Sequence, residues 1–286
     1  MIGIFASLVD GVLIGSVYGL AAMGLTLIWG VMDVVNLTHG SVIVAGMFAL
    51  YLLTNVFGIP PYLALLPIFI AGFLFGIALY WIAVHRMIGR PPLMILLSTF
   101  SVNLVLVGIG TALWGTVLFN VPVTLPGLNV ERYTFPGTHI LAAVLTAVMA
   151  ICLYLFLYRT RLGKALRAVA SNREAAELSG IPTTWMLSVS FGLGVALAGV
   201  SGMLIATLFP FTVLAGDAYQ LKSFVVVVLG GLGNPAGALI GGIALGLIEG
   251  LAAPFMPVSW TLIIEFALFV VVLIMFPRGI FAFRRS

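Results

Sequence analysis

Long apolar stretches dominate this chain and restrict the folds that it can adopt. Several of them exceed about 18 residues with few or no charges, the length that a helix needs to cross a bilayer. A water-soluble domain of 286 residues could not bury so much apolar surface, since 63% of its residues are hydrophobic and 7% are charged. A β-barrel would instead show short segments of alternating hydrophobicity. The sequence therefore predicts an all-α polytopic membrane protein.

We expect about eight membrane segments, including one broken or re-entrant element at 217–253. The complete spans are placed near 8–30, 36–57, 61–84, 93–115, 138–158, 186–209 and 259–276. The stretch at 217–253 is too short for two crossings, which need about 40 residues. Its centre reads GGLGNPAGALIGG, where glycine weakens a helix and proline removes a backbone donor. Two short helices that meet at this break are therefore predicted.

The basic residues gather at the ends of the predicted spans. They cluster at 85–90, at 159–173 and at Arg278, Arg284 and Arg285, and the positive-inside rule places all three clusters in the cytoplasm. The carboxyl terminus is then cytoplasmic, and we expect the amino terminus to be external. The net charge of +4 is explained by contact with membrane lipid, so no nucleic-acid partner is expected. Residues 1–286 form a single transmembrane domain with a cytoplasmic loop at 159–185.

This cytoplasmic loop contains a short predicted helix at 172–179 with a signal at each end. Ser171 and Glu174 have the S-x-x-E spacing of a capping box. Gly180 is placed to end the helix, and Pro182 prevents it from continuing. A helix of one to two turns is not stable alone, so we interpret it as an element that docks on a partner.

A second interruption lies in the first half of the chain, at 30–40, which reads GVMDVVNLTHG. Interrupted segments in the two halves of a transporter mark its substrate pathway, so this segment and the break near 230–242 are candidates for its lining. An ordinary cytoplasmic turn explains the same residues, and the sequence leaves both readings open. Glycines four residues apart, at Gly15/Gly19, Gly237/Gly241 and Gly242/Gly246/Gly250, predict close helix packing.

No sequence motif of an enzyme stands out. The chain has no phosphate-binding loop, no H-E-x-x-H, no Cys/His metal cluster and no G-x-S-x-G, so we expect neither a catalytic site nor a cofactor in it. Glu249 and Glu265 lie within apolar runs, where carboxylates are costly. Together with Asp33 they could form an ion relay, or they could pair locally. Lys222, with Asp217, is expected at the external mouth of the broken element.

Three motifs, in this order along the chain, resemble those of the permeases of branched-chain amino acid ABC importers, the LivH-like family. They are GLTLIWGVMDVVNLTHGSVIVAGMF at 24–48, REAAELSG at 173–180, and VVVVLGGLGNPAGALIGGIALGLIE at 225–249. The second resembles the E-A-A loop of ABC importers, but the I-x-L-P ending of that wider consensus does not follow Gly180. The likeness covers essentially the whole chain.

The resemblance implies a complex in the inner membrane of a prokaryote. A second permease subunit, identical or related, would complete the path, two ATPase subunits would hold ATP and magnesium, and an external binding protein would deliver the amino acid. Ala175 and Ala176 are small enough to let the short helix approach a groove on the ATPase. The residues expected to couple the helix to the ATPase are Arg173, Glu174, Ala175, Ala176, Glu177 and Gly180.

The polar or glycine-rich backbone at membrane depth predicts the lining of the pathway. The residues concerned are Asn36, His39, Gly40, Gly231, Gly233, Asn234 and Pro235. Leucine, isoleucine and valine follow as substrates from the resemblance alone, and related permeases for urea or short amides are an alternative. An ion-coupled carrier or channel that uses Asp33, Glu249 and Glu265 is another, and such a carrier would have no ATPase to dock.

Overall fold

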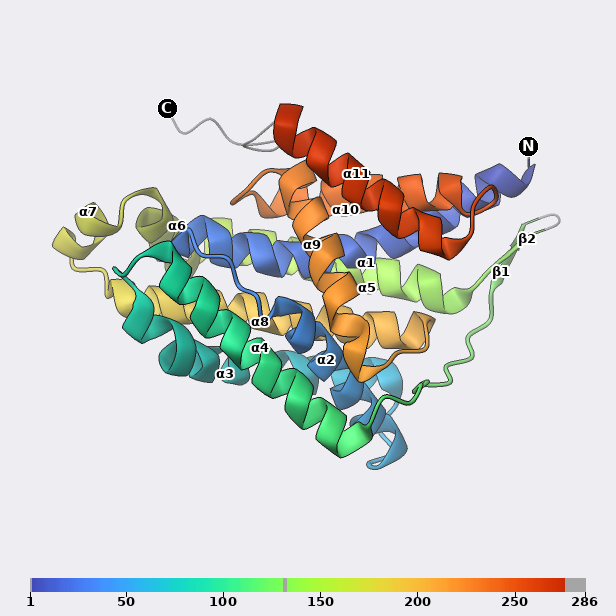
Figure 1. The fold of residues 1–286 in the computed structure, drawn as a ribbon, viewed down its shortest axis with the longest axis horizontal. Helices are drawn as coiled ribbons and strands as arrows, with labels where there is room; N and C mark the ends of the chain where they lie inside the picture. The colour runs from blue at the N-terminus through green and yellow to red at the C-terminus, as the bar shows by residue number, and fades with distance from the viewer. Residues whose placement is uncertain (1, 131–132, 276–286) are drawn as a thin grey trace.

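The computed structural model describes residues 2–130 and 133–275, and these residues form an all-α membrane protein (Figure 1). The long helices are α1 (Ile2–Met32), α2 (His39–Asn55), α3 (Leu65–Leu79), α4 (Pro92–Trp114), α5 (Gly137–Arg159), α8 (Thr183–Leu208), α9 (Gly216–Gly230), α10 (Pro235–Ala252) and α11 (Val258–Met275). Among the described residues, seven helical segments are long and apolar enough to cross a membrane. The predicted fold class is therefore confirmed.

The smaller elements lie at the two ends of the molecule. Helices α6 (Arg161–Ser171) and α7 (Arg173–Leu178) follow α5 at one end. Strands β1 (Leu128–Val130) and β2 (Tyr133–Phe135) pair antiparallel at the other end, near the amino terminus. Each predicted span overlaps a helix, and the largest difference is at α1, which begins six residues earlier than expected.

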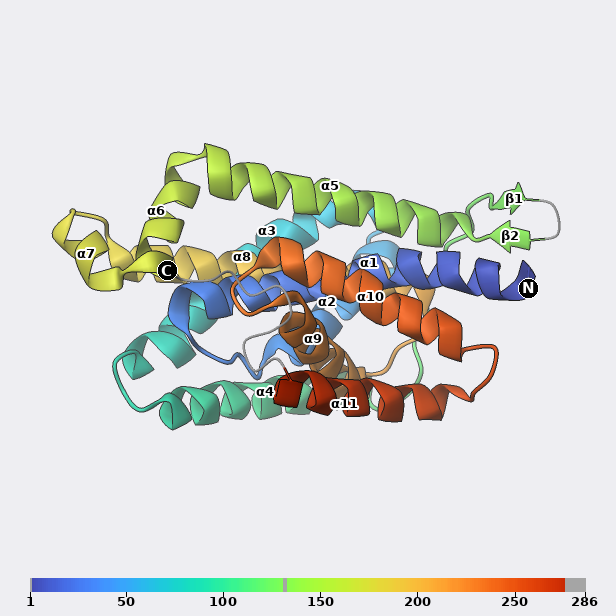
Figure 2. The same ribbon diagram turned by 90° about the horizontal axis from the view of Figure 1, so that it is seen from above.

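Helices α1 and α8 form the centre of the bundle, as Figure 2 shows. They run antiparallel and touch where Gly24 meets Gly194. α8 is buried along almost its whole length, whereas α3, α4 and α5 expose many large apolar side chains. An exposed apolar surface of this extent suits contact with lipid rather than with water.

The two halves of the chain have the same architecture in opposite orientations. α1 packs mainly on α10, and α8 packs mainly on α3. Each central helix is followed by an extended segment, at 33–38 after α1 and near 209–212 after α8, and then by a shorter helix that begins inside the bundle. α2 and α9, which begin in this way, contact each other. This arrangement is an inverted repeat, an architecture that recurs in membrane transporters.

The glycines at four-residue spacing lie where two helices approach closely. Gly15 and Gly19 of α1 face Gly242 and Gly246 of α10. A methyl group at Gly15, Gly242 or Gly246 would overlap the backbone of the opposite helix, and one at Gly19 would lie 3.0 Å from the backbone of Leu239. Gly237 and Gly241 likewise face the end of α9. Small residues permit such contact, and van der Waals packing then holds the helices together. The predicted close packing is confirmed.

Candidate functional site

The short helix in the loop is α7, and its cap differs from the prediction. Ser171 is the last residue of α6, and Asn172 is the N-cap, with its Oδ1 accepting a hydrogen bond from the N–H of Ala175 at 2.9 Å. The proposed capping box with Ser171 is therefore wrong. Asparagine is as good an N-cap as serine, and α6 extends to Ser171 because Leu166 and Val169 bury its apolar side.

Gly180 ends α7 in the predicted way. Its φ is +79°, its N–H donates to the carbonyl of Glu177 at 2.9 Å, and the N–H of Ile181 donates to the carbonyl of Ala176 at 3.0 Å. These two bonds form a Schellman motif, in which the residue with positive φ is usually glycine because it has no Cβ.

Most of α7 faces outward from the end of the molecule. Arg173, Glu174, Ala175 and Glu177 are exposed, whereas Ala176 is buried and anchors α7 to the protein. The expectation that Ala176 approaches a partner groove is therefore wrong. The structure instead presents Leu178, which is 91% exposed and which the sequence analysis missed. An apolar side chain between two polar neighbours near the end of a capped helix was the available signal.

The first break returns into the bundle. α1 ends near α7, Asp33 adopts a φ of +53°, and the extended segment 33–38 runs inward to the start of α2 (Figure 1). Asn36 and His39 are fully buried. The sequence left two interpretations open, an ordinary turn and an interruption inside the bundle, and each describes one part of the segment. Asp33 lies in a turn at the end of the molecule, and Asn36 to Gly40 lie in its interior.

Gln220 of α9 connects this break to the second half of the chain. Its Oε1 accepts a hydrogen bond from the N–H of Gly40, and its Nε2 donates to the carbonyl of Asn36 at 3.2 Å. The backbone of Gly40 touches that of Gly216 at the start of α9. The amino-terminal ends of α2 and α9 therefore meet inside the protein, and we refer to Asn36, His39, Gly40, Gly216 and Gln220 as the central junction.

The second break is a four-residue turn between α9 and α10. Gly231 and Gly233 have positive φ, and Asn234 caps α10 by accepting a hydrogen bond from the N–H of Gly237 at 3.1 Å. Pro235 occupies the first turn of α10, where its missing donor costs nothing. Two helices do meet at the predicted Gly/Asn/Pro break, but each of the helical segments around it, Val213–Gly230 and Pro235–Ala252, is long and apolar enough to cross a membrane.

The two predicted breaks are not equivalent positions of the repeat. In the fold, 33–38 corresponds to the segment after α8, and the turn at 231–234 lies against the end of α1. There the N–H of Gly233 donates to Thr26 Oγ1 at 3.3 Å, and Gly233 touches Gly30. The segment after α8 was not predicted from the sequence, because this segment contains only one glycine or proline. In the structure, the backbone of Phe211 in this segment pairs with that of Phe119.

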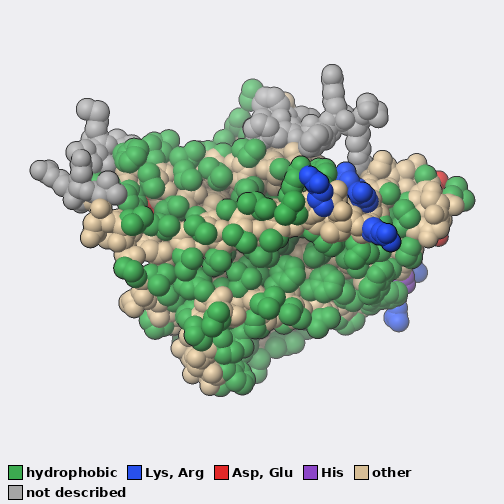
Figure 3. Space-filling model, turned by 180° about the vertical axis from the view of Figure 1, so that it is seen from behind, with side chains coloured by type: hydrophobic (Ala, Val, Ile, Leu, Met, Phe, Trp, Pro, Cys, Tyr) green, Lys and Arg blue, Asp and Glu red, His purple; other side chains and the backbone are tan. Residues whose placement is uncertain are grey.

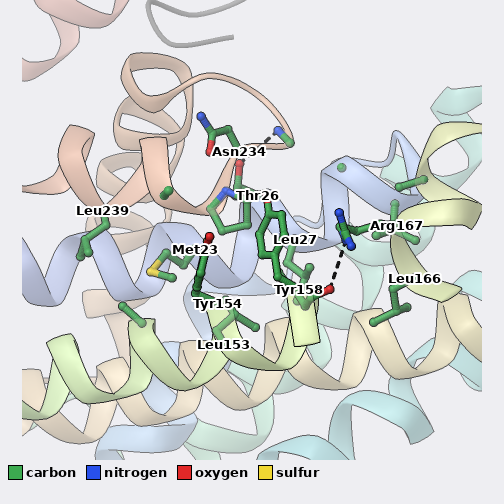
Figure 4. Close-up of a pocket in the computed structure, with 18 of the residues that line it drawn as sticks. Met23, Thr26, Leu27, Leu153, Tyr154, Tyr158, Leu166, Arg167, Asn234 and Leu239 are labelled. Carbon is green, nitrogen blue, oxygen red and sulfur yellow. Dashed lines mark hydrogen bonds between the residues drawn. The ribbon is translucent and has the colours of Figure 1, made fainter. Parts of the chain in front are cut away.

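Three of the predicted pathway residues, Gly233, Asn234 and Pro235, line a cavity of about 600 Å³. Its other walls come from α1, α5 and α6 (Figure 4). Asn36, His39, Gly40 and Gly231 do not line it. The structure therefore divides the seven predicted residues between this cavity and the buried interior.

The ionisable groups in the second half form a local cluster. Lys222 pairs with Glu249 and with Glu265, the latter at 2.8 Å, and its Nζ lies 4.8 Å from the centre of the Tyr18 ring. Lys222 was expected with Asp217 at the external mouth of the broken element, but its side chain is largely buried against two carboxylates on α10 and α11. Local pairing of the two acids is confirmed. Asp33 lies beside Arg173 and Ser171 at the α7 end, away from this cluster.

Replacing Lys222 by methionine should destabilise the fold strongly. Both carboxylates would lose their only cation among the described residues, and Glu265 is fully buried. Removing one partner of a buried ion pair costs about 3–5 kcal/mol. We expect a large fall in the thermal unfolding temperature of the purified protein. A triple variant that also carries Glu249→Gln and Glu265→Gln should recover much of it. An unfolding temperature equal to that of the exposed control Lys164→Met would contradict this assignment.

Comparison with known proteins shows which family this chain matches. Residues 7–273 match the family described as the permease component of branched-chain amino acid transport systems. The chain is 28% identical to the high-affinity branched-chain amino acid transport permease LivH of Salmonella typhimurium, over 95% of this chain and 93% of that protein. It is 29% identical to BraD of Pseudomonas aeruginosa, over 96% and 94%. A probable LivH of Methanocaldococcus jannaschii is 31% identical, over 81% and 76%.

Proposed function

Because the chain belongs to the permease-component family of branched-chain amino acid transport systems, we propose that it is the membrane-spanning subunit of an ATP-driven importer for these amino acids. Its relatives are transport permeases by name, which supports a role as a multi-pass inner-membrane permease and not as an enzyme. The observation that carries the ATP-driven part of the proposal is α7, a capped and exposed helix between two membrane helices.

The partners follow from this role. ATP and magnesium would be held by two separate ATPase subunits at the α7 end, which we assign to the cytoplasm together with the carboxyl terminus. A second permease subunit would complete the path. An external binding protein would deliver the amino acid at the opposite end, near the amino terminus and the β1–β2 hairpin.

Force on α7 has a direct route to the interior. α7 contacts α8, and α8 begins three residues after Gly180. α8 in turn packs on α1, α2 and α3, so a rigid displacement of α7 would shift α8 against the first half of the repeat. In this proposal, Arg173, Glu174, Ala175, Glu177 and Leu178 meet the ATPase, while Ala176 and Gly180 fix the angle of α7.

The central junction is the proposed gate. Asn36, His39 and Gly40 are closed off between α2 and α9, and Gly231 is buried at the end of α9. Rocking of α8 against α1 would separate α2 from α9 and admit the substrate. Gly233, Asn234 and Pro235 form the hinge between α9 and α10 in this account.

Cysteine substitutions test this gate in the background Cys152→Ala, which removes the native exposed thiol. We expect a water-soluble thiol reagent to modify a cysteine at Gly233 in the resting protein, because Gly233 is exposed. Cysteines at Asn36 and His39 should react at least tenfold faster during ATP-driven transport than at rest. Gly40 is left unchanged, because a Cβ there would overlap the backbone of Gly216. Protection of the cysteines at Asn36, His39 and Gly233 under both conditions would exclude this pathway.

The substrate is tested by reconstituting the full complex with its ATPases and binding protein. Uptake of labelled leucine that exceeds uptake of urea supports the proposal, whereas the reverse preference would assign the chain to permeases for urea or short amides. The ion-coupled alternative has less support, because Asp33 lies apart from Glu249 and Glu265, and these two acids pair locally with Lys222.

A further inference from the structure

The cavity of about 600 Å³ is a groove with three walls and a polar end. α1 forms its floor, α5 one side, and the start of α10 the other, and α6 closes one end (Figure 4). Met23 and Leu239 lie toward one end of the groove, and Arg167, a residue of α6, lies at the other. We propose that this groove binds one acyl chain of an anionic phospholipid of the cytoplasmic leaflet, with the lipid phosphate at Arg167.

The length of the groove fits a chain from one leaflet. On α5 its lining runs from Ala147 to Tyr158, which corresponds to about 16 Å at about 1.5 Å per residue. Half of the hydrocarbon core of a bilayer is about 15 Å. The side chains in this range are mainly aliphatic or aromatic, so an acyl chain that left the bilayer interior would find an apolar environment in the groove.

Arg167 is arranged to receive an anion. Its Nε donates to the carbonyl of Leu157 at 3.1 Å, and its guanidinium lies 4.4 Å from the centre of the Tyr158 ring. These contacts hold the side chain at the end of the groove. Among the described residues, its two terminal nitrogens form no ion pair, so their N–H groups remain for a ligand. A guanidinium matches the oxygen geometry of a phosphate.

The surroundings of Arg167 reinforce the choice of an anionic lipid. Arg161, Lys164 and Arg167 are exposed and recur every third residue of α6, which places them on one side of the helix. Basic side chains gather on the face that α5 and α6 form, toward the α7 end, as Figure 3 shows. Basic sites between membrane helices at the cytoplasmic surface bind anionic headgroups. The positive-inside rule places this end in the cytoplasm.

Native mass spectrometry of the full chain tests the inference. The protein is extracted from vesicles that contain equal amounts of phosphatidylglycerol and phosphatidylcholine, and the retained lipid is counted. We expect wild type to retain one phosphatidylglycerol. Arg167→Gln should lower the preference for phosphatidylglycerol about fivefold, which corresponds to about 1 kcal/mol for one basic residue at an anionic surface. Arg90→Gln, an exposed basic control outside the groove, should leave the preference unchanged.

A second pair of variants tests the acyl chain separately from the headgroup. Ala147→Trp places a large side chain in the groove from an exposed position and should abolish retention. Val148→Trp, at the next exposed position, does not line the groove and should have no effect. Equal unfolding temperatures would show that both variants fold. Equal retention in the two variants would overturn the proposal. Protection of the groove by a second permease copy, with no lipid retained, would also overturn it.

Discussion

Leu178→Asp should uncouple the permease from its ATPase. The Leu178 side chain is 91% exposed at the end of α7, so a partner that covers it would remove apolar surface from water. A hot-spot residue at the centre of an interface contributes about 2 kcal/mol or more, and we assign that role to Leu178. We therefore expect affinity for the ATPase to fall about 30-fold, since about 1.4 kcal/mol corresponds to tenfold. Binding of purified ATPase and ATP-driven uptake are the measurements.

Leu128→Asp is the matched control for this variant. Leu128 is also strongly exposed, at 61%, but it lies in β1 at the opposite end of the molecule. It should leave ATPase binding unchanged. If the two variants bind the ATPase equally well, α7 is not the docking element, and the route of force through α8 fails with it.

Gly246→Leu should prevent stable packing of α1 on α10. A side chain at this position would overlap the backbone at Gly11 and Gly15 of α1. The two helices cannot move apart to make room, because both are packed on further helices. Overpacking of a core costs about 1–3 kcal/mol and occasionally more, and we expect the upper end of that range because backbone and not a flexible side chain blocks the site. Thermal unfolding in detergent measures the change.

Gly108→Leu provides the comparison. Gly108 is also helical, in α4, but nothing lies within 4 Å of a methyl group placed there. Its unfolding temperature should stay near that of wild type. Equal losses in the two variants would show that leucine disturbs these helices generally, and that close contact between α1 and α10 is not required.

The sequence predicted the elements that depend on local chemistry. Apolar length located the spans, and Gly231, Gly233 and Pro235 located the break between α9 and α10, because positive φ and a missing donor are properties of single residues. Gly180 was placed correctly for the same reason. The N-cap at Asn172 was missed by one residue because serine and asparagine are both good caps, and the choice depended on how far α6 extends.

The relations between distant segments could not be predicted in the same way. The contact of Gln220 with Gly40 joins residues 180 positions apart, and nothing in the local pattern of either segment indicates it. The pairing of Lys222 with Glu249 and Glu265 likewise depends on the packing of three helices. The inverted repeat was missed because its two halves share an architecture without a shared sequence motif, so the break at 231–234 was matched with the wrong partner segment.

The dependence of transport on the ATPase tests the central claim most directly. Vesicles with the permease, its permease partner and the binding protein are loaded with ATP, and uptake of labelled leucine is measured with and without the ATPase subunits. The account predicts accumulation against a gradient only with ATPase present, and its loss in Leu178→Asp. Accumulation by the permease without any ATPase, driven by an ion gradient, would contradict it.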